Sequence, residues 1–143
     1  MSIAQSDRST LLALDEEELF ANLARNDQTT MAALGASAQV EQGFLTRAEL
    51  QGTMQAAGLA WNDLVAAGKA LFRKLWEAAR DIVCGAYGEL TGNGGIGPVL
   101  DWVAEQIVAR LNWQAHVAYL VVRAAVKSGL DNLCRMSAMP VKG

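Results

Sequence analysis

The fold is decided by residues 61–83, which read WNDLVAAGKALFRKLWEAARDIV. Apolar side chains recur there at steps of three and four residues, the spacing that places them on one face of an α-helix. The stretch therefore predicts one amphipathic helix of about six turns. Gly68 lies on the apolar face, where a missing side chain lets another helix approach closely. That face consists of Trp61, Leu64, Val65, Gly68, Leu71, Phe72, Leu75, Trp76, Ala79, Ile82 and Val83.

Helical signals also precede this segment. Asp15 with Glu18, and Thr46 with Glu49, have the spacing of capping boxes, so helices are expected to begin near both pairs. Residues 29–43 fit a short helix less well, because two glycines lower the helical preference there. The N-terminal part of the chain is therefore predicted to be helical as well.

Two more helices are predicted downstream. Pro98 suits the first turn of a helix, and residues 113–128 form a helix that is apolar almost all round and stops at Gly129. A helix that is apolar on every side is either central to a bundle or is itself a contact surface.

These segments predict an all-α protein with one domain, a bundle of five to six helices. We expect the bundle to span residues 10–135, between a flexible N-terminal tail at residues 1–9 and a frayed C-terminal tail at residues 136–143. A chain of 143 residues is one domain by default and is long enough to bury a core.

Charge and composition narrow the classes of function. Three arginines against eight acidic residues give residues 1–60 a net charge of −5, and nine basic against seven acidic residues give residues 61–143 a net charge of +2. Neither half is basic enough to attract nucleic acid. We find no secretory signal, and the apolar stretch at residues 115–126 is shorter than a bilayer span, so a reducing, cytoplasmic location is expected.

The stretch GNGGIG at residues 92–97 matches the G-x-G-x-x-G pattern of dinucleotide-binding loops. That pattern holds a pyrophosphate when a strand precedes it and a helix follows it. Here the end of a helix precedes it, so we interpret the stretch as a connection between helices, and no cofactor is expected. Gly92, Gly94, Gly95 and Gly97 are then the candidate hinge.

Cys84, Cys134 and the single histidine, His116, offer three soft metal ligands at irregular spacing, whereas a structural zinc site takes four. No metal site is predicted. Both cysteines end apolar segments, which favours buried small side chains; whether they meet as a redox pair is left open. With one histidine in the middle of a helix, no catalytic residue and no enzymatic activity are predicted.

Polar side chains at positions 116, 119, 123 and 127 share one face of the last long helix. This stripe fits a solvated edge or a binding strip for an acidic partner. Trp102 lies beside the apolar stripe of its own helix, so it is expected to be exposed, as interface anchors often are. The candidate partner-binding residues are Trp102, Tyr119, Leu120, Arg123 and Lys127.

The C-terminal half, from LFRKLWEAARDIVCG at residue 71 to AYLVVRAAVKSGLDNLC ending at residue 134, carries a short motif. Val83-Cys84 ends one helix, and an apolar helix is followed by Gly-Leu-x-x-x-Cys at residues 129–134. In these features the chain resembles small uncharacterised bacterial all-helical proteins. Some of those accompany defence or conflict systems, so the resemblance implies an adaptor or a regulatory subunit.

We therefore expect a non-enzymatic helical module that binds another protein or itself, as a homo-oligomer, through an apolar helix surface. In the alternative, the helices from Pro98 to Ser128 open as an apolar hairpin, and the protein is a membrane-active, pore-forming or bilayer-perturbing effector. A nucleotide-binding subunit is a third hypothesis that rests on the glycine loop. The sequence identifies no small-molecule substrate.

Overall fold

The computed structural model describes residues 5–34, 43–56, 58–93 and 97–142. Over these residues the chain forms eight helices and no strand, which confirms the predicted all-α class. The count exceeds five or six because the first expected helix is divided at Leu14 and a short helix follows the long helix that ends at Gly85. The helices are α1 (Gln5–Ala13), α2 (Glu16–Arg25), α3 (Gln28–Ala33), α4 (Arg47–Ala56), α5 (Trp61–Gly85), α6 (Tyr87–Asn93), α7 (Gly97–Leu111) and α8 (Ala115–Lys142).

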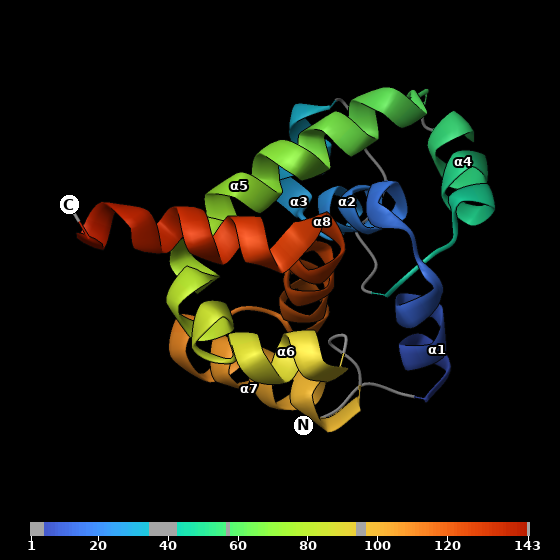
Figure 1. Cartoon of the computed structure of the whole chain (residues 1–143). Helices are drawn as coiled ribbons and strands as arrows, with labels where there is room; N and C mark the ends of the chain where they lie inside the picture. The colour runs from blue at the N-terminus through green and yellow to red at the C-terminus, as the bar shows by residue number, and fades with distance from the viewer. Residues whose placement is uncertain (1–4, 35–42, 57, 94–96, 143) are drawn as a thin grey trace.

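The long amphipathic helix predicted from residues 61–83 is α5, and it crosses α2 in close contact (Figure 1). A Cβ atom on Gly68 would lie 1.9 Å from the carbonyl oxygen of Phe20. This approach brings backbone against backbone, so Gly68 sets the distance between the two helices. Aromatic rings fill the same crossing, because Phe20 meets Phe72 edge-on at 5.5 Å between ring centroids, and Phe72 stacks on Trp76 at 5.9 Å.

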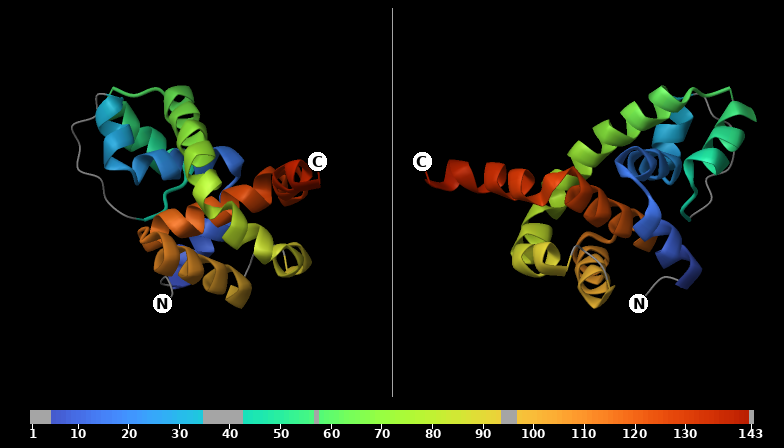
Figure 2. Two further views of the ribbon diagram at one scale, coloured as in Figure 1. Left: turned by 90° about the vertical axis from the view of Figure 1, so that its left-hand side faces the viewer. Right: turned by 45° about the vertical axis from the view of Figure 1, so that its right-hand side comes forward.

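The central helix of the bundle is α8. Residues 118–125 of α8 are buried throughout, so this apolar helix is the interior member that the sequence left as one of two alternatives. At Gly129 the backbone takes a φ of 108°, and the helix changes direction at the predicted stop. The chain then continues as a helix to Lys142 and projects away from the body, where we expected a frayed tail from residue 136 (Figures 1 and 2).

The first helix begins earlier than the sequence suggested. Residues 5–9, which we expected in the flexible tail, form the first part of α1. Leu11 and Leu14 are buried in the core and anchor this helix, which explains why it is not a tail. The predicted capping box of Asp15 and Glu18 is present and begins α2 as a separate helix.

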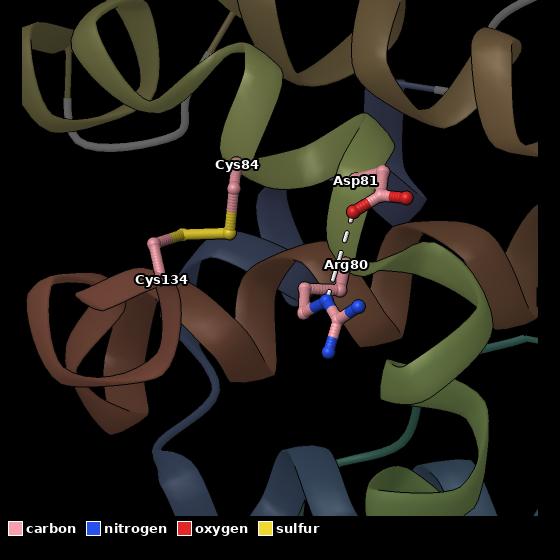
Figure 3. The surroundings of a disulfide bond; sticks show 4 residues. All are labelled: Arg80, Asp81, Cys84 and Cys134. Carbon is pink, nitrogen blue, oxygen red and sulfur yellow. Dashed lines mark ion pairs between the residues drawn. A yellow bond between two sulfur atoms is a disulfide. The ribbon is translucent and has the colours of Figure 1, made fainter. Parts of the chain in front are cut away.

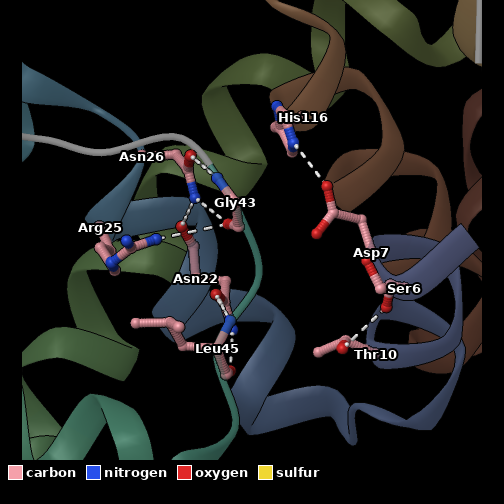
Figure 4. A network of polar contacts seen from close by, with 9 residues as sticks. All are labelled: Ser6, Asp7, Thr10, Asn22, Arg25, Asn26, Gly43, Leu45 and His116. Carbon is pink, nitrogen blue, oxygen red and sulfur yellow. Dashed lines mark hydrogen bonds and ion pairs between the residues drawn. The ribbon is translucent and has the colours of Figure 1, made fainter. Parts of the chain in front are cut away.

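Two buried asparagines, Asn22 in α2 and Asn26 at its C-cap, hold the segment that leads into α4 (Figure 4). The side-chain amide of Asn22 donates to the carbonyl oxygen of Leu45 at 2.8 Å and accepts from the amide nitrogen of Leu45 at 2.8 Å. Asn26 makes the same pair of bonds with Gly43, at 3.0 and 3.3 Å. The two asparagines lie one helical turn apart, and the two residues that they bond are two positions apart. Their side chains therefore hold the segment against α2 by hydrogen bonds to its backbone.

Substitution of Gly68 by Ala is expected to destabilise the fold by about 3 kcal/mol, because the new methyl group would overlap the backbone of Phe20 and force the helices apart. Gly52→Ala is the matched control: Gly52 lies in α4 with no atom near its Cβ position, and alanine there should stabilise the helix by up to about 1 kcal/mol. Urea denaturation followed by circular dichroism measures both. A Gly68→Ala variant as stable as the wild type would contradict the close crossing.

Candidate binding surface

The five residues predicted to bind a partner do not share one surface. Tyr119 and Leu120 are fully buried and Arg123 is 5% exposed, so these three belong to the core. The reason is that α1, α2, α5 and α7 surround this part of α8, and the polar stripe faces neighbouring helices. Lys127 is exposed on the same helix, and Trp102 lies on α7 with 53% of its surface exposed.

The buried stripe on α8 is held by a charged partner from α7. The Tyr119 hydroxyl donates to Oδ1 of Asp101 at 2.5 Å, and Nη2 of Arg8 donates to both carboxylate oxygens of Asp101 at 2.6 and 2.7 Å. Burial, reinforced by the hydrogen bond to Asp101, raises the pKa of Tyr119 well above its ordinary value. Burial also lowers the pKa of Arg123, one turn further along α8.

His116 also links α8 to the N-terminal helix α1. Its Nε2 atom lies 3.7 Å from Oδ2 of Asp7 on α1, and its ring centroid lies 5.0 Å from that of Phe44 (Figure 4). His116 is therefore placed as a bridge between α8, α1 and the segment before α4. These contacts could not be predicted from local sequence patterns, because their partners lie far away along the chain.

A small apolar cleft surrounds Trp102. It has a volume of about 320 Å³ and lies between the end of α5, the start of α6 and the first two turns of α7. Most of its described lining is apolar, and within that lining Glu89 is the one ionisable residue. The lining residues are Gly85, Ala86, Glu89, Pro98, Val99 and Trp102.

The position of Trp102 follows from helical spacing. Pro98 and Val99 lie four and three residues before Trp102, so the three side chains share one face of α7. Leu100, Val103 and Ile107 point into the core instead and are fully buried. Trp102 is the one large apolar side chain that is exposed in the described part of the chain, which agrees with the exposure predicted for it.

A second hollow runs between α3 and α5. It has a volume of about 550 Å³ and adjoins a hollow of about 360 Å³ that reaches Trp113 and Val117. Asp27, Thr29 and Leu71 line both hollows. Apolar and polar side chains both line this groove, and its aromatic residue, Trp113, is only partly exposed, so the groove lacks the exposed anchor that distinguishes the Trp102 cleft.

The two cysteines meet. Cys84, in the last turn of α5, and Cys134, in α8, form a disulfide with 5.6 Å between their Cα atoms (Figure 3). This corrects the interpretation of the pair as separate buried small residues, and it answers the question of their proximity. The sequence could not show the bond, because 50 residues separate the cysteines and their meeting depends on how α5 and α8 cross.

The candidate hinge is only partly within the described residues. Gly92 belongs to α6 and Gly97 is the first residue of α7, whereas Gly94 and Gly95 lie outside the described ranges. The glycine-rich stretch therefore lies between two helices, as we predicted when we interpreted it as a connection. Its use as a hinge stays a prediction.

Within the described ranges, no cluster of three or more His, Cys, Asp or Glu side chains is placed to hold a metal ion. None of the described helices combines the length and the apolar content needed to cross a bilayer. No family model, curated protein or solved structure matches the chain.

Tyr119→Phe is expected to flatten the loss of stability at alkaline pH. The pKa of Tyr119 is raised in the folded chain, so above about pH 10 the phenol ionises first in the unfolded chain. The free energy of unfolding of the wild type should then fall by up to about 1.4 kcal/mol per pH unit, a contribution that is fully present below pH ~10. In the Tyr119→Phe variant this pH dependence should be absent. At neutral pH the loss of the hydrogen bond to Asp101 should lower the free energy of unfolding by about 1 kcal/mol.

Urea denaturation from about pH 8 to about pH 11 measures the slope. Tyr87→Phe removes the other tyrosine of the chain and is the matched control, because it leaves the Tyr119 contribution in place. Equal alkaline slopes for Tyr119→Phe and the wild type would show that the Tyr119 hydroxyl is not held as the structure describes.

Proposed function

We propose that this protein is a non-enzymatic helical interaction module that binds a protein partner through the Trp102 cleft. The observation that carries the proposal is the exposure of Trp102 at the edge of an apolar hollow. Tryptophan is enriched among the residues that dominate binding energy, especially where a pocket lies beside it. The other large apolar side chains of the described residues are buried or partly buried against the core, so folding itself gives no reason for this exposure.

The partner that fits this surface best is a second copy of the chain. The same patch presents a protruding indole and a hollow, and a two-fold interface requires such self-complementarity. The indole N–H of an inserted Trp102 needs an acceptor when it is buried. Glu89 lines the hollow, and a carboxylate accepts several hydrogen bonds at once. We therefore propose that the indole N–H of Trp102 in one copy donates a hydrogen bond to the carboxylate of Glu89 in the other.

The membrane-active alternative has less support. It requires the helices from Pro98 to Ser128 to leave the body as an apolar hairpin. Their apolar side chains already lie in the core, where Val103, Ile107 and Val121 are fully buried. Opening the hairpin would expose these side chains together with Asp101, which Arg8 and Tyr119 hold. Leakage of dye from anionic liposomes tests this alternative directly.

The biological setting of the module is also part of the proposal. The resemblance of the C-terminal half to proteins that accompany bacterial defence systems supports a role as an adaptor or a regulatory subunit. The cytoplasmic location stays a prediction. Disulfides are rare in the cytosol, so the state of Cys84 and Cys134 there depends on the local reductant.

The proposal predicts weak dimers that depend on Trp102. A patch of this size falls below the usual interface, so the dissociation constant should lie between about 1 μM and about 1 mM. Trp102→Ala should weaken dimerisation by at least about 30-fold, or about 2 kcal/mol, because it removes the anchor. Sedimentation velocity across this concentration range measures the effect.

Lys127→Ala is the matched control for the dimer, since Lys127 is exposed on α8 and lies outside the cleft. It should dimerise like the wild type. A wild-type protein that stays monomeric up to about 1 mM would refute self-association through this cleft. A dimer that Trp102→Ala leaves unchanged would assign the interface to another surface.

A further inference from the structure

The disulfide adjoins one wall of the Trp102 cleft. Cys84 directly precedes Gly85 and Ala86, which line the cleft, and the amide of Ala86 bonds back to the carbonyl oxygens of Cys84 and Val83. Every residue that lines the cleft lies between Cys84 and Cys134 in the sequence. The bond therefore closes a covalent loop that contains both walls of the cleft.

The other end of the bond holds the segment that follows the break at Gly129. That segment packs on the body through Leu130, which is 4% exposed, and through the half-buried Leu133. Beyond Cys134 the helix projects away from the body (Figures 1 and 2). Among the residues of the segment whose side chains are described, these two leucines and the disulfide attach it to the body, and Gly129 has a positive φ at the kink that precedes it.

The disulfide is within reach of a reductant. Cys84 and Cys134 are both only partly buried and pack against the core from its edge. The neighbouring side chains, Arg80 and Asp81, lie at the surface, and the Asp81 side chain is 91% exposed (Figure 3). An accessible disulfide can exchange with an external thiolate, whereas a buried one cannot.

We propose that the Cys84–Cys134 disulfide is a redox latch that holds the segment after Gly129 and the α5 wall of the Trp102 cleft in place. Its effect on binding rests on the proposed function of that cleft. The reductant is a dithiol of the kind found in reducing compartments. In the latched state the cleft is formed; in the reduced state the segment from Leu130 onward detaches and the wall at Gly85 and Ala86 loosens.

The chemical step is thiol–disulfide exchange. A thiolate of the dithiol attacks one sulfur of the Cys84–Cys134 bond, forms a mixed disulfide and releases the other cysteine as a thiolate, which takes up a proton. The second thiol of the reductant loses its proton and attacks the mixed disulfide, and this releases the first cysteine. Two electrons pass to the protein, which gains two thiols, while the dithiol becomes a disulfide.

Hydrogen exchange read by mass spectrometry tests the latch on the full chain, with and without dithiothreitol. On reduction, the amides of residues 130–134 and 85–90 should exchange at least about tenfold faster, while those of residues 64–79 in α5 keep their protection. A Cys84→Ser, Cys134→Ser double variant should exchange like the reduced wild type whether or not the reductant is present. This control separates the bond from other effects of the reductant.

Sedimentation velocity of the same samples reports on binding, and reduction should weaken the dimer by about tenfold. Unchanged exchange of residues 130–134 and 85–90 on reduction overturns the latch. So does a loss of helicity across the whole chain, because the bond would then support the entire fold. A wild type that is monomeric in both redox states refutes the proposed function, while the exchange measurement still decides the latch.

Discussion

The close contact between α2 and α5 at Gly68 sets the geometry on which the rest of the molecule depends. It brings the backbone of one helix against that of the other, so it fixes their separation without relying on side-chain conformations. Because α5 is one continuous helix, this contact also places its far end, about five turns away. There Gly85 and Ala86 form a wall of the Trp102 cleft, and Cys84 ties the helix to α8.

Polar groups join the N-terminal third of the chain to this framework. Arg8 reaches Asp101 on α7, and Asn22 and Asn26 hold the segment before α4. A buried donor or acceptor that loses its partner costs about 1–3 kcal/mol, so each of these contacts is specific as well as stabilising. The apolar core could tolerate small shifts between helices, whereas these hydrogen bonds admit a single arrangement of α1, α2 and the α4 segment.

The sequence predicted what depends on neighbours along the chain. The capping boxes of Asp15 and Thr46, the close approach at Gly68, the stop at Gly129 and the exposure of Trp102 follow from spacings of three or four residues within one helix. Contacts between segments that are distant in the sequence could not be predicted from such local spacings. The polar stripe on α8 is an example, because the same polar helix face can be exposed to solvent or can pack against polar partners inside the protein.

The helix α8 did carry a signal in the sequence for its burial. It is apolar almost all round, and such a helix has little surface to give to solvent. Placing it at the centre would have required its few polar side chains to find partners, and a carboxylate on another apolar helix, Asp101, was the natural candidate for Tyr119. The partner of that carboxylate, Arg8, lay in a segment expected to be a tail, so the network could not be assembled from local patterns.

The cleft and the disulfide are two consequences of one topology. The chain leaves α5, forms α6 and α7, and returns through α8 to a point beside the end of α5. The return brings Cys134 to Cys84 and encloses the segment that contains both walls of the cleft. A bond that closes such a loop restricts the motion of its contents, because loop closure removes conformational freedom from the chain between the linked residues. Any change in that bond therefore acts first on the region that presents Trp102.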